Sequence, residues 1–349
     1  MTTKIVKIDG EHINLHVIEE VATLLKQGGL VAFPTETVYG IGANALNENS
    51  IKRIYEAKGR PSDNPLIVHI AQLSDVYKYV SEVSDISLKL MNKFWPGPLT
   101  LIFNKNATLS SVITGGLETV AIRLPSNNIA KAIIKASGLP IAAPSANRSG
   151  KPSPTRAKHV IEDLDGLVDM IIDGGKAQIG LESTVLDVSS SIPVLLRPGS
   201  VTIEMLEKEI GQVLIDPTLI GEHEKITPKS PGMKYKHYAP KGMLAVVYGE
   251  DYLAIKEINQ LVKEKEVAGY SVAVISTDED KEMYQCENIM VIGSKNNGIE
   301  IAANLFKILR KMDEKGIEYI YTKAFSEENI GMATMNRLLK AAGNKKICL

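Results

Sequence analysis

A proline-rich, basic segment in the second half of the chain limits how this sequence can fold. Residues 225–241, KITPKSPGMKYKHYAPK, contain three prolines, one glycine, five lysines and no acidic residue. Proline lacks a backbone N–H group and interrupts helices and central strands, so this stretch is predicted to be a linker or an ordered flap. The 349 residues are enough for a domain on each side. We therefore predict domains at 1–212 and 242–349, joined by a linker or lid at 213–241.

The chain before the linker has the pattern of a mixed α/β domain. Amphipathic spacing predicts helices at 15–27, 50–58, 84–94 and 127–137. Apolar runs of strand length outnumber these helices, so we expect one large, twisted, mixed sheet with helices packed on it. The predicted strands are 30–33, 65–70, 99–103, 119–124, 140–144, 169–173, 183–188 and 194–197.

After the linker, strands and helices alternate more regularly, which predicts a small Rossmann-like domain with a parallel sheet. The expected strands are 243–249, 271–277, 289–293 and 317–323, and the expected helices are 251–267, 297–314 and 327–342.

Composition excludes several classes of protein. Lys+Arg 40 against Asp+Glu 41 gives a net charge of -1, so no global positive field attracts nucleic acid. Cys286 and Cys348 are too few for a disulfide framework and fit no metal-ligand spacing. No signal peptide and no run of about 18 apolar residues is visible, so a cytoplasmic protein without a metal site of its own is expected.

The stretch FPTETVYGIGANA (33–45) offers two threonine hydroxyls, the Glu36 carboxylate and a tyrosine in what reads as a glycine-rich turn. Such a turn after a strand can bind a ligand or can satisfy its own backbone, and the sequence leaves both open. Its loose G-x-G-x-x-A pattern is a poor dinucleotide fingerprint, because the next helix begins only near Ile51.

Lys58 and Arg60 lie at the end of a predicted helix, with Ser62 nearby. Two cations and a hydroxyl at this spacing can clamp a phosphate, although cations at a helix C-terminus also complement the helix dipole. Lys58 is expected to point along the sheet edge. His69 follows in a predicted strand, where most lone histidines are structural or surface residues, so a structural role stands beside the functional one.

Further candidates lie at strand ends. In TVAIRL (119–124), alternation places Thr119 and Arg123 on one face, and a buried arginine needs an anion, either a protein or a substrate carboxylate. Ser145 and Asn147 share one side of an extended segment, and Arg197 ends another strand. This set of hydroxyls, amides and cations suits a phosphorylated, carboxylate-bearing ligand, with catalysis by positioning and charge stabilisation.

In these motifs the chain resembles the L-threonylcarbamoyladenylate synthases of the long, two-domain type. The resemblance implies a YrdC-like first domain that makes threonylcarbamoyl-AMP and pyrophosphate from ATP, L-threonine and bicarbonate, as the first stage of threonylcarbamoyladenosine formation in tRNA. It also implies Mg²⁺ with the ATP and transfer of the product to a tRNA threonylcarbamoyltransferase complex. The motifs are PTETVYG (34–40), Lys58 with Arg60, NPLIVH (64–69), WPGPLT (95–100), Ser145 with Asn147, STV (183–185), RPG (197–199) and SPGMKYKHYAP (230–240).

The resemblance also assigns residues to the two substrates, with Lys58, Arg60, Ser145 and Asn147 as the catalytic group. The nucleotide would contact Lys58, Ser62, Thr119, Ser145, Asn147, Ser153 and Arg197. Apart from the resemblance, Tyr235, His237 and Tyr238 of the lid are groups able to stack on the nucleotide or bond to it, and the alternative is a basic, solvated connector. The threonine part would contact Thr35, Arg60, His69, Arg123, Ser183 and the backbone of Ala143, with Arg123 on the carboxylate.

Two other functions fit the same cations. A non-catalytic module could hold double-stranded RNA through Lys58, Arg60 and the linker lysines, although the near-zero net charge argues against it. A transferase that uses carbamoyl phosphate would share the anion clamp.

Overall fold

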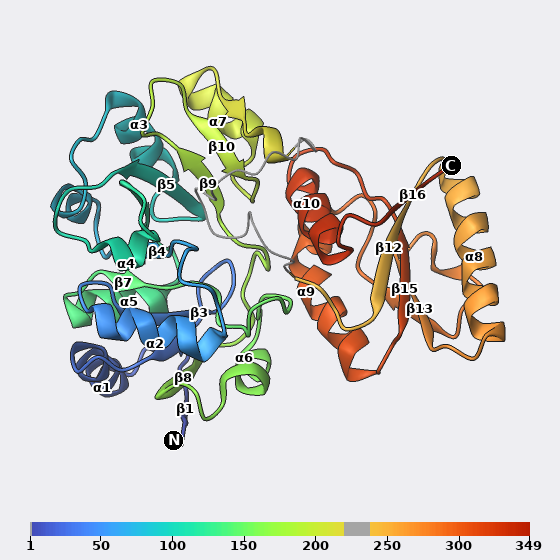
Figure 1. The fold of residues 1–349 in the computed structure, drawn as a ribbon, viewed down its shortest axis with the longest axis horizontal. Helices are drawn as coiled ribbons and strands as arrows, with labels where there is room; N and C mark the ends of the chain where they lie inside the picture. The colour runs from blue at the N-terminus through green and yellow to red at the C-terminus, as the bar shows by residue number, and fades with distance from the viewer. Residues whose placement is uncertain (1, 220–237) are drawn as a thin grey trace. The chain divides into compact units, whose positions relative to one another are not determined.

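The computed structural model describes residues 2–219 and 238–349, which form two compact units (Figure 1). Each unit has its own sheet, and each is described by itself. Within the described residues, the first unit comprises 2–149, 153–178 and 182–219, and the second comprises 150–152, 179–181 and 238–349.

The first unit is built on one 11-stranded sheet that mixes parallel and antiparallel pairs, which confirms the predicted mixed fold. The strand order is β1-β8-β2-β3-β7-β4-β6-β5-β9-β10-β11, so β8 lies between β1 and β2 and pairs in parallel with both. The strands are β1 (Lys4–Lys7), β2 (Val31–Phe33), β3 (Gly40–Asn44), β4 (Ile67–His69), β5 (Leu99–Asn104), β6 (Thr119–Arg123), β7 (Ile141–Ala142), β8 (Met170–Asp173), β9 (Thr184–Asp187), β10 (Val194–Arg197) and β11 (Leu214–Ile215).

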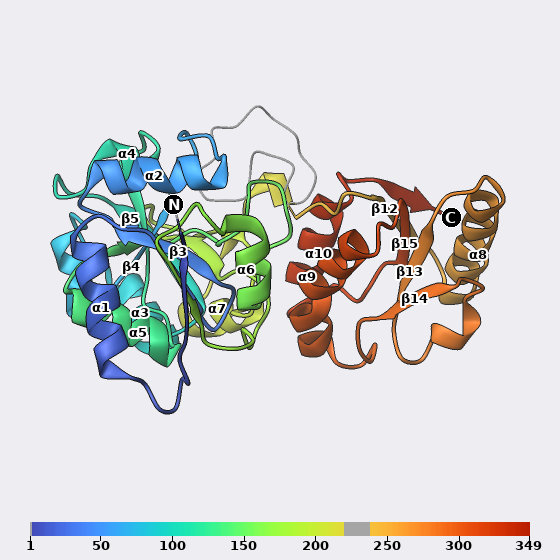
Figure 2. The same cartoon turned by 90° about the horizontal axis from the view of Figure 1, so that it is seen from below.

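Helices pack on this sheet, and the four predicted ones end within one residue of their predicted ends, whereas the helices at 111–114, 157–164 and 203–210 were not predicted. Asn47 and Asn127 cap the N-termini of α2 and α5, and Gly59 and Gly138 end these helices with φ of 60° and 64°. α1 and α5 pack together over a core that includes Phe33, whereas α2 and α4 lie beside each other elsewhere (Figure 2). The helices are α1 (Leu15–Lys26), α2 (Glu48–Lys58), α3 (Asp85–Phe94), α4 (Ser111–Thr114), α5 (Asn128–Ser137), α6 (Ala157–Leu164) and α7 (Ile203–Ile210), with 3-10 turns η1 (Leu73–Lys78) and η2 (Pro217–Leu219).

The predicted glycine-rich turn at 33–45 is wrong in its second half, because residues 40–44 form β3, antiparallel to β2. Close packing explains the glycine at this point. A Cβ atom on Gly42 would lie 2.4 Å from Cε1 of Phe33, so only glycine lets the two strands pair in this way. The glycines of the loose G-x-G-x-x-A pattern therefore belong to a strand and do not open a helix.

The second unit contains a five-stranded sheet whose pairs are all parallel, in the order β14-β13-β15-β12-β16, and this confirms the predicted Rossmann-like domain. The short strand β16 was not predicted. The strands are β12 (Met243–Tyr248), β13 (Val272–Ser276), β14 (Asn288–Val291), β15 (Tyr319–Lys323) and β16 (Lys346–Cys348), and the helices are α8 (Asp251–Val267), α9 (Gly298–Glu314) and α10 (Gly331–Ala341), with a 3-10 turn η3 (Lys281–Met283). No helix among the described residues is both long and apolar enough to span a bilayer.

Candidate functional site

A small apolar cluster on one face of the first sheet forms the floor of the candidate site. Ile67, Ile102, Ala121, Val185 and Leu196 are buried together there. The strand register sets Ile67 of β4 and Ile102 of β5 on either side of Ala121 of β6. Side chains alternate along a strand, so the residues two positions away on β4 and β6, His69 and Arg123, share this face.

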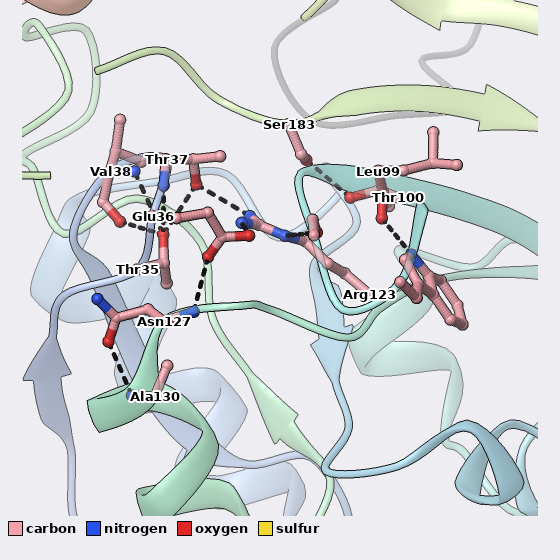
Figure 3. Close-up of polar contacts among 12 residues, drawn as sticks. Thr35, Glu36, Thr37, Val38, Leu99, Thr100, Arg123, Asn127, Ala130 and Ser183 are labelled. Carbon is pink, nitrogen blue, oxygen red and sulfur yellow. Dashed lines mark hydrogen bonds and ion pairs between the residues drawn. The ribbon is translucent and has the colours of Figure 1, made fainter. Parts of the chain in front are cut away.

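Arg123 is buried at the end of β6 and is held by three hydrogen bonds (Figure 3). Its guanidinium donates to Oε1 of Glu36 at 2.7 Å, to Oγ1 of Thr37 at 3.0 Å and to the carbonyl of Gly97 at 3.2 Å. The sequence left open which carboxylate meets this arginine, and the structure places a protein carboxylate there. A guanidinium has five N–H donors. Within the described residues three are used, which leaves two for a ligand.

Glu36, which the residue assignments passed over, is also buried and links Arg123 to helix α5. Its Oε2 accepts from the backbone N–H of Asn127 at 3.4 Å, and the side chain of Asn127 caps α5 through the N–H of Ala130 at 3.1 Å (Figure 3). Burial by itself would raise the pKa of Glu36, but the charge and the hydrogen bond of Arg123 outweigh burial and lower it. Glu36 is therefore ionised at neutral pH.

Thr35, assigned to the threonine part, forms hydrogen bonds within its own loop and is linked to Arg123 through Thr37. Its hydroxyl lies 2.8 Å from that of Thr37 and donates to the carbonyl of Val38 at 2.6 Å. Thr37 in turn accepts from Arg123. The threonines of this loop thus satisfy local backbone and also connect to Arg123, and ligand binding by the loop stays a prediction.

His69 lies on strand β4, and the backbone of Ala143 bonds to the same strand. His69 is 2% exposed and pairs with Arg123 in the register of β4 and β6. Burial, and then the charge of Arg123, lower the pKa of His69 to about 3, so the imidazole is neutral at physiological pH. The backbone N–H of Ala143 donates to the carbonyl of Ile67 at 3.0 Å, which commits that donor to the sheet.

Ser183 joins the two predicted groups of residues. The hydroxyls of Ser183 and Thr100 lie 2.7 Å apart (Figure 3). Arg197 donates to the Ser183 hydroxyl and to its carbonyl, both at 3.0 Å. Ser183 was assigned to threonine and Arg197 to the nucleotide, so these two assignments adjoin. Thr100 was missed, although its place in the run 99–103 puts it on the same face as Ile102.

Lys58 is 2% exposed, so it does not point into open solvent. The loop at 145–147 covers it, and its ammonium donates to the carbonyls of Ser145 and Asn147, the latter at 2.7 Å. Burial first, and then the charge of Arg60, hold the pKa of Lys58 well below its usual value. The structure thus brings together the four residues of the predicted catalytic group. The guanidinium of Arg60 donates to the carbonyl of Pro65 at 3.0 Å.

Two acidic residues near Lys58 were missed. Glu182 is 7% exposed and accepts a hydrogen bond from the hydroxyl of Ser153, an assigned nucleotide contact. The charges of Asp163 and Glu182 favour the protonated form of Lys58 and partly offset its burial. Glu182 could have been found from the sequence, because it directly precedes the assigned Ser183 in LESTV (181–185).

Ser62, Thr119 and Tyr238 complete the assigned residues that the structure describes. Ser62 is exposed, and Thr119 is half-buried at the start of β6. Tyr238 belongs to the second unit, where its ring lies 5.1 Å from that of Phe306 and below the guanidinium of Arg337 at 5.8 Å. Tyr235, His237 and most of the predicted lid lie outside the described residues, so their roles stay predictions. No group of three His, Cys, Asp or Glu that could hold a metal occurs in the part of the chain that the structure describes.

Both halves of the chain match known protein families. Residues 23–199 match the Sua5, YciO and YrdC family model, described as telomere recombination, and residues 201–343 match the C-terminal domain of threonylcarbamoyl-AMP synthase. The chain is 49% identical to the threonylcarbamoyl-AMP synthase of Bacillus subtilis, over 95% of this chain and 94% of that protein. It is 48% identical to the enzyme of the same name from Pyrococcus abyssi, over 97% of each.

A solved structure gives the same result in three dimensions. The crystal structure of P. abyssi Sua5 complexed with L-threonine is 46% identical in sequence and superposes with a TM-score of 0.94, covering 99% of this chain and 100% of that one. A double variant of the same protein superposes equally well, with a TM-score of 0.94.

Proposed function

The chain belongs to the threonylcarbamoyl-AMP synthase family, and from this we propose that it converts L-threonine, bicarbonate and ATP into threonylcarbamoyl-AMP and pyrophosphate. The observation that carries the threonine part is Arg123, buried beside an apolar floor with two N–H donors left over. The similarity to a protein whose crystal structure contains L-threonine supports the same conclusion.

The threonine site follows from the geometry around β6. The two remaining donors of Arg123 suit a carboxylate, which accepts hydrogen bonds from an arginine in a fixed fork. The apolar cluster beside it suits the methyl group of threonine. Neutral His69 and the hydroxyls of Thr35 and Ser183 are polar groups without net charge, and they suit the hydroxyl and the carbamate of the bound intermediate.

The nucleotide site follows from the cations. In the proposed reaction, an oxygen of the N-carboxylated threonine attacks the α-phosphorus of ATP, the bond from that phosphorus to the bridging oxygen breaks, and pyrophosphate leaves. Lys58, Arg60 and Arg197 would meet the negative charge that develops there, with Ser145 and Asn147 as neighbours of Lys58. No protein nucleophile is required, because the substrate itself supplies the attacking oxygen.

We expect Mg²⁺ to enter with the ATP polyphosphate, since Mg²⁺ prefers phosphate oxygens and water to a protein cage. The acidic residues near Lys58 are paired or covered, which suits a metal held mainly by its nucleotide. Chelation by EDTA should then stop turnover without lowering the melting temperature of the ligand-free protein. A fall in that temperature would instead indicate a resident metal.

The labile product would pass to a tRNA threonylcarbamoyltransferase complex. A mixed anhydride of a carbamate and a phosphate hydrolyses readily, so direct transfer to a partner enzyme is favoured. A pull-down with the purified transferase components, with and without the three substrates, tests this step.

A pyrophosphate-release assay tests the proposed function. Release should require ATP, threonine and bicarbonate together and should stop when any one of them is omitted. Release without threonine would contradict the assignment, and release driven by carbamoyl phosphate would favour the other transferase chemistry. Binding of double-stranded RNA with no pyrophosphate release would leave a non-catalytic module.

A further inference from the structure

We propose that Glu36 is a positioning residue for the threonine carboxylate, acting by holding the guanidinium of Arg123 in the orientation that leaves its two remaining donors for substrate. This inference rests on the proposed function. It goes beyond that function because it gives a task to a residue that does not itself need to touch either substrate.

The geometry of the pair fixes the orientation of Arg123. Oε1 of Glu36 lies 2.7 Å from Nη2 of Arg123, and the side chains of the two residues are only 4% and 5% exposed. A buried arginine without a fixed partner has several rotamers of similar energy, and an ion pair with hydrogen bonds selects one of them. Thr37 and the carbonyl of Gly97 hold the other two nitrogens, so the plane of the guanidinium is set from three sides.

Glu36 is itself held at the start of helix α5. Its other oxygen accepts from the backbone N–H of Asn127, at the start of α5, and α5 packs against α1 through a buried core. The partial positive charge at a helix N-terminus favours a carboxylate at this position. Glu36 therefore connects Arg123 to a rigid helix, and a movement of Arg123 away from its site would break contacts to that helix.

Positioning and simple charge neutralisation have different effects on threonine binding. If Glu36 only cancelled the charge of Arg123, its removal would strengthen the attraction of Arg123 for an anion, and threonine would bind more tightly. If Glu36 orients the fork, its removal lets the guanidinium turn toward the carbonyl and hydroxyl acceptors nearby, and threonine binds more weakly. The two possibilities predict opposite signs.

Two substitutions distinguish them. Glu36→Gln keeps the shape of the side chain and removes the charge, whereas Glu36→Asp keeps the charge and withdraws the carboxylate by one methylene group. The matched control is Asp169→Asn, which removes the carboxylate from another arginine pair of the same unit, Arg53–Asp169 at 2.9 Å. Threonine and ATP affinities are measured separately by calorimetry, and the KM for threonine and kcat are measured by pyrophosphate release.

We expect Glu36→Gln to weaken threonine binding and to raise the KM for threonine about tenfold, and Glu36→Asp to do so about fivefold, since part of a bidentate contact is lost. For both variants, ATP affinity should stay within about twofold of wild type, and kcat at saturating threonine within about threefold. A contact that binds the substrate equally in the ground state and the transition state changes KM and not kcat when it is lost. Asp169→Asn should leave all four quantities unchanged.

Unchanged or tighter threonine binding in Glu36→Gln would overturn the proposal, as would equal weakening of threonine and ATP. If Glu36→Gln does not fold, as judged by its melting curve, Glu36→Asp decides the matter, because positioning predicts weaker threonine binding and neutralisation predicts no change. A wild-type protein without threonine-dependent pyrophosphate release would reject the proposed function. A wild-type protein that has this activity, with Glu36 variants that bind threonine normally, would reject only the present inference.

Discussion

The hydroxyl of Ser183 accepts a hydrogen bond from the guanidinium of Arg197 at 3.0 Å, and the same arginine donates to the carbonyl of Ser183. One of these residues is assigned to threonine and the other to the nucleotide. Two substrates that react with each other must come within bonding distance, and this contact is where their two groups of residues adjoin. A change at Ser183 should therefore be felt by both ligands.

We predict that Ser183→Ala weakens the binding of both threonine and ATP, each about threefold to tenfold, because one hydrogen bond contributes about 1 kcal/mol. Calorimetric titration of each ligand alone measures this effect. Ser189→Ala is a suitable control, since the Ser189 hydroxyl bonds only Asp187, at 2.6 Å, among the described residues. Weakening of one ligand with no change in the other would mean that the contact does not couple the two sites.

Lys58→Ala should lower the rate of pyrophosphate release roughly a hundredfold or more, corresponding to about 3 kcal/mol of lost charge stabilisation. Because Lys58 is buried and satisfies two carbonyls, the same change should also lower the free energy of unfolding, by about 2–4 kcal/mol. Denaturant titration and kinetics on the folded fraction separate the two effects. Activity within threefold of wild type would reject the nucleotide assignment of Lys58.

Arg123→Lys keeps a positive charge but loses the fork, so we expect threonine affinity to fall about tenfold or more while ATP affinity stays nearly constant. Arg53→Lys provides the comparison, because Arg53 also pairs with a carboxylate but lies outside the proposed site. If calorimetry shows that both ligands weaken equally in Arg123→Lys, then Arg123 serves the fold or meets phosphate instead.

The folded-state pKa of His69, about 3, lies below its ordinary value of 6.5. Between these pH values the unfolded chain binds a proton that the folded protein does not bind. The stability contribution of neutral His69 is thus fully present above about pH 6.5 and is lost as the pH falls toward 3, by about 1.4 kcal/mol per pH unit.

Urea titrations of wild type and His69→Asn at pH 7.5, 6 and 4.5 measure this dependence. The variant should lose less stability on acidification than wild type, whereas His16→Asn, at an exposed position, should follow wild type. Parallel loss of stability in wild type and His69→Asn would show that His69 is already protonated in the folded protein.

Local sequence patterns predict most elements of both sheets, because apolar periodicity and capping residues act over a few neighbours. The strands that they miss are β1, β3, β11 and β16, and the helices that they miss are α4, α6 and α7. β3 was missed because its two glycines are typical of turns, whereas at Gly42 the ring of Phe33 on the neighbouring strand leaves no room for a Cβ atom. β16 is only three residues long and too short to show a period.

The sequence likewise predicts part of the candidate site and misses the rest. The residue types at strand ends indicate an anion site, but the partners of Lys58 and Arg123 cannot be read from nearby sequence. Glu36 and Arg123 are 87 residues apart, and so are Lys58 and the carbonyl of Ser145. Both contacts depend on how β3, β7, β4 and β6 order themselves in the sheet. The burial of Lys58 and the pairing of Glu36 therefore become visible only in the folded structure.

The place of β8 between β1 and β2 has a consequence for how the protein is made. β2 pairs with β3 on one side, but residues 4–7 and the other side of residues 31–32 find their partner strand only when residues 170–173 have been synthesised. Contacts between residues so distant in sequence close large loops, and such topologies fold slowly. While the ribosome is still adding β8, the nascent chain exposes two unpaired strand edges, so we expect the first unit to be more prone to aggregation during translation than after release.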